Sequence, residues 1–131
     1  MAKEADFSEL EKYLSSFKTM TEDFNEFLRN FIYKEAERVI AKTKRRTPVD
    51  TGALKAAWDI ESIVVNGDTI EAIIVNPMEY ATFVEYGHTS LGGDWIAGYF
   101  MVTISIDDVQ RQLPKRFEKQ FYEFVKSKGV G

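Results

Sequence analysis

Apolar residues recur through the first third of the chain with the spacing of an amphipathic helix. Between residues 24 and 40 they fall at i, i+3, i+4 and i+7, which places them on one helical face. Two capping-box sequences, Asp6 to Glu9 and Thr19 to Glu22, mark sites at which a helix can begin. The pattern predicts a short helix over about 7–17 and a long helix over about 20–46.

The long predicted helix is large for a chain of 131 residues. At roughly 1.5 Å per residue it would extend over about 40 Å, whereas a compact domain of this size has a radius of gyration of about 14 Å. The helix therefore spans the whole domain. An amphipathic helix that extends past its own domain usually packs against a partner, which is a first indication of oligomerisation.

A helix breaker and a new helix cap stand close together after this helix. Pro48 ends the helix because proline lacks a backbone N–H, and Asp50 or Thr51 can cap a second, short helix. Gly52 fits a close approach of the backbone here. We interpret Thr47 to Leu54 as a rigid elbow, and we expect substitution of its first two residues to impair assembly more than folding.

The next segment carries a β-hairpin pattern. Residues 58–65 and 69–75 are rich in β-branched side chains, and Asn66-Gly67-Asp68 stands between them. Asn-Gly between such runs is a strong hairpin signal, because both central residues of a type I′ turn need a positive φ. The pattern therefore predicts a small antiparallel sheet.

The remaining chain combines a short helix, a loop and a long helix. Tyr80 to Gly87 forms one apolar helical face and ends on a glycine suited to a C-cap. Residues 88–98 hold three glycines and predict a flexible loop. Large apolar residues occupy every second position of 100–106, a period that predicts a strand. Asp107-Asp108 can cap a final helix, which Pro114 either kinks or begins.

These elements predict an α+β fold in a single domain over 1–131. Its parts are a long N-terminal amphipathic helix, a short helix, a small antiparallel sheet built on a β-hairpin, a second short helix and a C-terminal helix. In sequence, 1–47 is a helical arm, 48–98 holds the hairpin and short helices, and 99–131 is a mainly helical C-terminal element.

Composition narrows the chemistry. With 44% apolar residues and ten phenylalanines the chain can build a globular core. It contains no cysteine, which excludes disulfides and thiolate metal sites and fits the reducing cytoplasm. The charged N-terminus lacks a signal-peptide core, and no apolar run approaches the roughly 18 residues that cross a bilayer, so we expect no membrane partner.

Charge is distributed unevenly. Residues 1–47 carry ten Lys/Arg and nine Asp/Glu, residues 48–110 carry one and ten, and residues 111–131 carry six and two, so the segments are +1, −9 and +4. The acidic middle does not resemble a nucleic-acid-binding core. Cations at the end of the long helix are a candidate DNA contact, although complementing the helix dipole is the favoured interpretation. These cations are Lys42, Lys44, Arg45 and Arg46.

The chain offers little for catalysis. Its single histidine, His88, lies near Glu85 and Asp94, and this trio is the sequence basis for a metal-dependent hydrolase. Neither a nucleophile elbow, a dinucleotide-binding glycine motif nor a phosphate-binding loop is present. We therefore expect no catalytic, cofactor-binding or metal-binding residues. The hydrolase and a DNA-binding module remain as alternatives from other functional classes.

Three sequence blocks, starting at residues 47, 76 and 95, resemble a family of tailed-phage proteins. They are similar, in order, to T-P-V-D-T-G-x-L-(R/K)-x-x-W, N-x-x-x-Y-A-x-(Y/F)-V-E-(Y/F)-G-(H/T) and W-V-x-G-x-F-M-L-x-I-S. The family is a tail-component family named for gene product ten of a lambdoid siphophage and related to the lambda minor tail protein Z. The resemblance covers about residues 7–127. The motif residues of the first two blocks are Thr47, Pro48, Val49, Asp50, Thr51, Gly52, Leu54, Trp58, Tyr80, Ala81, Val84, Glu85, Gly87 and His88.

The resemblance implies a structural virion protein without catalysis or cofactor. Members are placed at the head–tail junction as neck or tail-completion proteins, and a tail terminator or head-closure ring protein is the alternative in this class. The implied partners are further copies in a ring, a hexamer to match the sixfold tail, and other neck or tail proteins. The implied location is the virion, with the host cytoplasm during assembly. The third block usually opens the C-terminal helix, which favours a helix over a strand at 99–106.

An acidic ring lining would suit a DNA conduit, because like charge lets the duplex pass without binding. We therefore expect part of the acidic middle segment, with Glu85 and Asp94, to face the lumen and the helices to form the ring contacts. In such a ring the elbow would fix the angle between the ring-forming helix and the hairpin.

Overall fold

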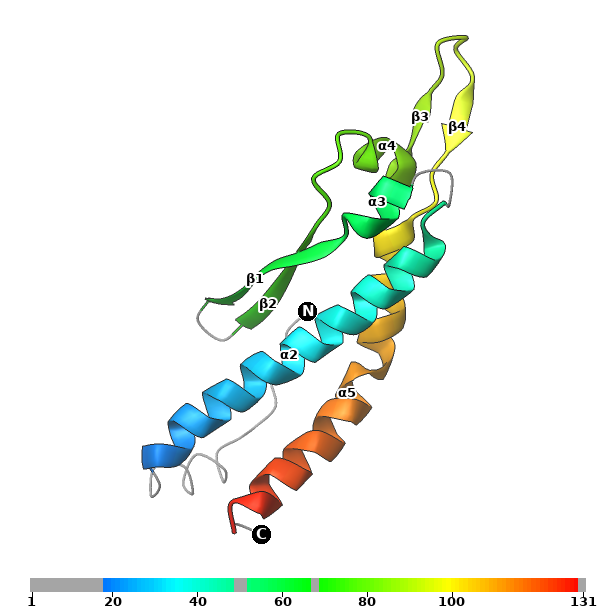
Figure 1. Ribbon diagram of the computed structural model, residues 1–131. Helices are drawn as coiled ribbons and strands as arrows, with labels where there is room; N and C mark the ends of the chain where they lie inside the picture. Colours follow the sequence, from blue (N-terminus) through cyan, green and yellow to red (C-terminus); the bar gives the residue numbers. More distant parts are fainter. Residues whose placement is uncertain (1–17, 49–51, 67–68, 130–131) are drawn as a thin grey trace.

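The computed structural model of the protein describes residues 18–48, 52–66 and 69–129. Two long helices lie side by side, one β-hairpin packs against the first helix, and a second hairpin projects from one end (Figure 1). This arrangement confirms the predicted α+β class. The elements are α2 (Lys18–Arg46), α3 (Gly52–Ala56), β1 (Asp59–Asn66), β2 (Thr69–Val75), α4 (Ala81–Tyr86), β3 (Gly87–Thr89), β4 (Trp95–Ala97) and α5 (Met101–Ser127).

The two long helices are antiparallel and meet through a row of phenylalanines. The closest pair is Phe27 of α2 and Phe124 of α5, whose stacked rings lie 4.8 Å apart. The rings of Phe31 and Phe117 pack edge to face with their centroids 5.3 Å apart, about one helical turn further along the seam. Aromatic pairs of this kind each stabilise by about 0.5–1.5 kcal/mol beyond the area that they bury. The helix predicted at 20–46 is thus confirmed, and its apolar face is covered by α5 of the same chain.

A buried ion pair also joins the two helices. Glu35 is only 4% exposed, and its carboxylate accepts hydrogen bonds from the Nε and Nη2 atoms of Arg116 at 2.9 and 2.6 Å. These hydrogen bonds raise the pKa of Arg116 above its ordinary value. Arg116 also donates to the carbonyl of Val109, two turns earlier in α5, on the other side of Pro114.

The main core lies where α3, α4 and the start of α5 meet. Leu54 and Met101 have no exposed surface, and Trp58 and Ala81 complete the buried cluster. Each large side chain buried in this way contributes about 1.5–3 kcal/mol. The core therefore fixes the two short helices against the first turn of α5.

The first hairpin matches the sequence prediction closely. β1 and β2 pair antiparallel from Asp59 opposite Val75 to Asn66 opposite Thr69, with a bulge between Ile60 and Ser62. The predicted turn residues, Gly67 and Asp68, lie outside the described residues, as do the predicted helix at 7–17 and the predicted cap at Asp50 or Thr51.

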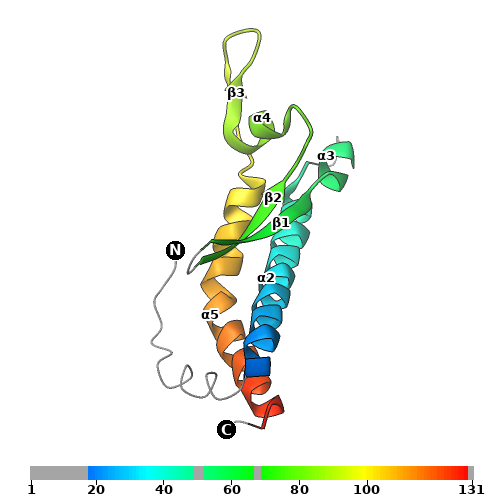
Figure 2. The same cartoon turned by 90° about the vertical axis from the view of Figure 1, so that its left-hand side faces the viewer.

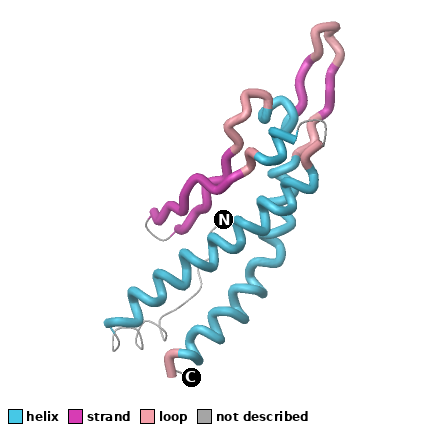
Figure 3. Tube along the Cα trace, viewed as in Figure 1, coloured by secondary structure: helices cyan, strands magenta, loops and turns pink. Residues whose placement is uncertain are grey.

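Two predictions about residues 88–106 are wrong. Residues 88–98 contain a second hairpin, β3–β4, which projects beyond the short helices rather than forming a flexible loop (Figures 2 and 3). Residues 101–106 are helical, as the family resemblance favours, and the strand period is misleading. The buried side chains of this turn, Met101 and Ser105, are four residues apart, whereas Ile104 is 42% exposed. Pro114 is therefore interior to α5 and does not begin it.

Candidate functional site

The first motif block packs into the protein interior. Thr47 is 3% exposed, and its hydroxyl donates to the carbonyl of Thr43 at 2.7 Å while accepting from the indole Nε1 of Trp58 at 3.0 Å. Leu54 is fully buried, and its carbonyl accepts from the amide of Asn76 at 2.9 Å. The eleven-residue spacing from Thr47 to Trp58 is thus explained by one buried hydrogen bond.

This burial changes the interpretation of the elbow. Val49, Asp50 and Thr51 lie outside the described residues, so the elbow angle has no direct test. Thr47 and Leu54, at the two ends of the elbow, are buried, and their substitution should first impair folding. The expected close approach at Gly52 is wrong for the part of the chain that the structure describes, because a Cβ placed there would meet no atom of these residues within 4 Å.

In the second block, Glu85 holds the start of α5. It is 3% exposed, and its carboxylate accepts from the backbone N–H groups of Val102 and Thr103 at 3.1 and 2.9 Å. The Thr103 hydroxyl donates to the same carboxylate at 2.6 Å. The N-cap residue, Phe100, has a positive φ of 48° and gives no side-chain cap. Glu85 therefore supplies from α4 the capping acceptor and the negative charge that a helix N-terminus favours.

Two glycines allow β3 and β4 to cross the end of α4. Gly87 has a φ of 90°, and a Cβ at Gly98 would lie 2.3 Å from the carbonyl oxygen of Glu85. Such contacts are impossible for any side chain, so glycine is required at both positions. The carbonyls of Val84 and Glu85 accept from the N–H groups of Tyr99 and Phe100, which closes the junction between α4 and α5.

The other residues of the second block also support packing. Ala81 is part of the buried core, and Tyr80 and Val84 pack against it. The ring of His88 lies 5.6 Å from that of Phe83, and its Nδ1 is buried without a hydrogen-bond partner among the described residues. The residues of this block therefore pack together to form the junction between α4 and α5.

The hydrolase alternative receives no support from this geometry. No group of three or more His, Cys, Asp or Glu residues within 18–48, 52–66 and 69–129 is placed to hold a metal ion. Both carboxylate oxygens of Glu85 are engaged by α5. Asp94 lies in the β3–β4 turn, where its backbone exchanges hydrogen bonds with Ser90. Because Glu85 is buried, its expected place on a DNA-facing lumen is also wrong.

One end of the molecule exposes an unusual amount of aromatic surface. Six large apolar side chains on or next to α4 and the β3–β4 hairpin are between 42% and 65% exposed. No Lys or Arg occurs between Lys55 and Arg111, so this surface has no cation of its own in the sequence. Exposed aromatic clusters of this kind commonly mark protein–protein contacts. We call this surface the aromatic end, and it consists of Phe83, Tyr86, Trp95, Ile96, Tyr99 and Phe100.

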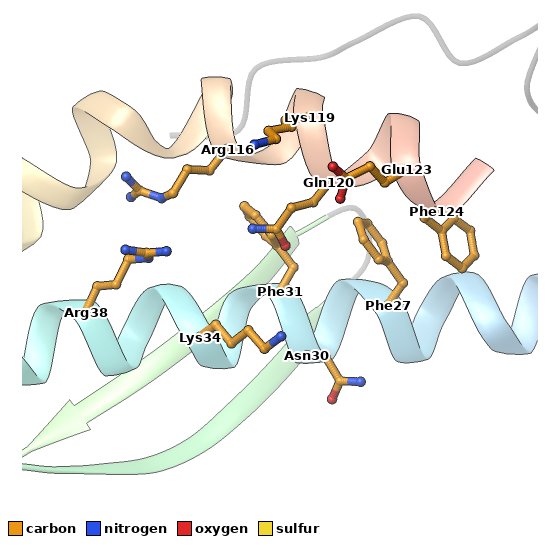
Figure 4. Close-up of a pocket in the computed structure, with 10 residues that line it drawn as sticks. All are labelled: Phe27, Asn30, Phe31, Lys34, Arg38, Arg116, Lys119, Gln120, Glu123 and Phe124. Atoms are coloured by element: carbon orange, nitrogen blue, oxygen red, sulfur yellow. The ribbon is translucent and has the colours of Figure 1, made fainter. Parts of the chain in front are cut away.

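A cationic groove runs along the seam between α2 and α5 (Figure 4). One hollow of about 730 Å³ is lined in part by Phe27, Phe31 and Phe124. A second hollow of about 340 Å³ shares Arg38 and Arg116 with the first. The cations lining the two hollows are Lys34, Arg38, Lys42, Arg45, Arg116 and Lys119.

This groove includes only part of the candidate DNA contact. Lys42 and Arg45 line it, whereas Lys44 lines neither hollow. Arg46 faces α5, where it bonds the Ser105 hydroxyl at 3.0 Å and pairs with Asp108 at 2.6 Å. The four-residue spacing of the α2 cations at 34, 38 and 42 is visible in the sequence and could have indicated a stripe. The α5 cations could not be added to it without the fold.

Comparison with known proteins identifies a family to which the chain is similar. Residues 8–87 match the model of the HK97-gp10-like family, a family of bacteriophage tail components. This range includes the first two motif blocks and ends before the third. Neither the curated proteins nor the solved structures contain a match to the chain. No helix in the described part of the chain is both long and apolar enough to cross a membrane.

Proposed function

Because the chain belongs to the HK97-gp10-like family of phage tail components, a structural part of the virion, we propose that it acts at the head–tail junction. There it would serve as a neck or tail-completion subunit without catalytic activity. Copies would form a ring, a hexamer matched to the sixfold tail, through which double-stranded DNA passes without specific binding. Other neck or tail proteins would contact the ring from above and below.

The aromatic end is the observation that best supports this proposal. A protein that acts alone in solution has little use for Trp95 at 65% exposure beside Tyr99 at 57%. Tyr and Trp are enriched at interfaces because they bury a large area at low entropic cost. The end projects away from the helix pair, so it is free to meet a second protein while the helices contact neighbouring copies (Figure 2).

The deciding experiment is a reconstruction of the neck of the phage or prophage particle that encodes the chain. We expect a closed ring of this protein between the head connector and the tail tube. Removal of its gene should leave DNA-filled heads and separate tails. Infectious particles of normal form without this protein would contradict the proposal.

The same reconstruction distinguishes the alternative in this class. Density for this protein directly on the head connector would identify a head-closure protein, and density on the last ring of the tail tube would identify a tail terminator. In either case the protein would still form a ring, but its position within the junction would differ from the one proposed.

A further inference from the structure

The β1–β2 hairpin presents an acidic outer face. Val64 stands opposite Glu71 in the register, and both side chains are exposed. Asp59, paired with Val75, lies on the same face by register and is exposed, and Glu61 is exposed beside it at the bulge. The inner face carries Ile74, which packs against the core together with Ile40 of α2. We call Asp59, Glu61, Val64 and Glu71 the hairpin face.

Some cations of the cationic groove form no ion pair with the residues that the structure describes. The Glu35 carboxylate is already shared between Arg38 and Arg116, and Asp108 is paired with Arg46. Lys34, Lys42 and Lys119 form no ion pair with any residue in the described part of the chain. One carboxylate of the lining, Glu123, is also unpaired among the described residues, so the unpaired groups leave a net positive charge. The partly exposed rings of Phe27 and Phe124 offer apolar contact area.

The groove and the hairpin face point in different directions on one molecule. Arg38 lines the groove, and Ile40 packs toward the core on the sheet side. Two residues along an α-helix correspond to a rotation of about 200°, so these side chains leave α2 on nearly opposite sides. The close-up shows the β1–β2 hairpin behind α2, with Lys34 in front of it (Figure 4). A hairpin face and a groove can therefore meet only between two copies.

We propose that the hairpin face of one copy docks in the cationic groove of the next. The carboxylates of the first copy would pair with Lys34, Lys42 and Lys119 of the second, and Val64 would meet the phenylalanine lining. Because the two surfaces differ, the contact is head-to-tail, and a head-to-tail contact closes a ring when its rotation permits. The inference rests on the proposed ring and assigns its subunit interface.

A phosphate backbone is the competing occupant of the groove, and the observations favour the second copy. Phosphate contacts gain from cations and backbone N–H groups, not from the partly exposed apolar rings of Phe27 and Phe124. The same chain also carries the matching acidic face, which a DNA-binding groove would not require.

Charge reversal tests the contact. The groove variant is Lys34→Glu with Lys119→Glu, and the hairpin variant is Glu61→Lys with Glu71→Lys. The mass of the purified full chain is measured against concentration for the wild type, each variant and an equal mixture of both. Each variant alone should associate at least about tenfold more weakly, because two pairs become repulsive. The mixture should recover association, since every groove then finds a hairpin of opposite charge.

The control is Lys115→Glu with Lys126→Glu, which changes the charge equally at exposed α5 positions outside the groove. It should associate as the wild type does, and circular dichroism should show all variants folded. Association that is unchanged in both reversal variants, or absent in the mixture, would overturn the pairing and leave the ring to another surface. A wild type that stays monomeric at all concentrations would overturn the pairing too, while the neck position remains open to the particle reconstruction.

A parallel binding experiment with duplex DNA tests the competing occupant, a phosphate backbone. Salt-sensitive DNA binding that is lost in the groove variant, together with unchanged self-association, would assign the groove to phosphate and refute the proposal. We expect no such binding by the wild type.

Discussion

Glu85 closes the N-terminus of α5 by accepting hydrogen bonds from both the backbone N–H and the hydroxyl of Thr103. The acceptor comes from α4 and not from the residue that precedes the helix. The position at which α5 begins is thus set by Glu85, which lies 18 residues before Thr103 in the chain. The acidic residue that the family motif places before Tyr86-Gly87 is therefore a helix cap, and its role is to join two helices.

Replacement of Glu85 by glutamine should destabilise the protein by about 2–3 kcal/mol. The amide can accept only through its oxygen, and its NH₂ would face the donors of Val102 and Thr103. Urea unfolding followed by circular dichroism measures the change. The control Glu79→Gln removes an exposed carboxylate six residues earlier, just before α4, and should leave the midpoint within error. Equal midpoints for the two variants would refute the capping role.

Substitution of Gly98 by alanine should cost about 3 kcal/mol or more, because the new methyl group would overlap the backbone of Glu85 and Tyr86. Thermal unfolding measures the loss. Gly92→Ala is the matched control, since its nearest contact would be an ordinary 3.8 Å to the Ser90 hydroxyl. Equal melting temperatures for the two alanine variants would contradict the close approach of β4 to α4.

Thr47→Val should destabilise by about 1–3 kcal/mol, since it keeps the shape but removes the acceptor of the Trp58 indole N–H. Unfolding monitored by tryptophan fluorescence gives the value. Thr82→Val makes the same chemical change at an exposed site and should have little effect. A stable Thr47→Val chain that fails only in particle assembly would restore the elbow interpretation of the first motif.

Removal of Arg116 should be more harmful than removal of the whole ion pair. Arg116→Leu leaves the Glu35 carboxylate buried with only the exposed Arg38 as partner, at a cost of about 3 kcal/mol. The double variant with Glu35→Leu should regain part of that stability. Arg111→Leu breaks an exposed pair with Asp107 and should cost less than about 0.5 kcal/mol. A double variant less stable than Arg116→Leu would contradict the desolvation argument.

What the sequence predicted well depends on local pattern. The long helix was predicted from apolar spacing over 20–46, and the first hairpin from Asn-Gly between β-branched runs. Both signals act over a few residues, so they need no knowledge of the rest of the chain. The boundaries of β2 were predicted without error.

What failed depends on contacts between distant residues. Residues 100–106 carry a strand period, but the carboxylate of Glu85 makes this segment a helix start. The β3–β4 hairpin has strands of three residues each, too short to leave a periodic signal. The cationic groove combines Lys34 with Lys119, which only the antiparallel pairing of α2 and α5 brings together. Charge counts by segment could not reveal it.

The crossing at Gly87 and Gly98 has a mechanical consequence. The tip formed by β3 and β4 is tied to α4 by backbone contact and to α5 through both the carbonyl and the carboxylate of Glu85. These contacts restrain the orientation of the tip relative to α4 and α5. A protein that binds the tip would therefore also fix the orientation of α2 and α5.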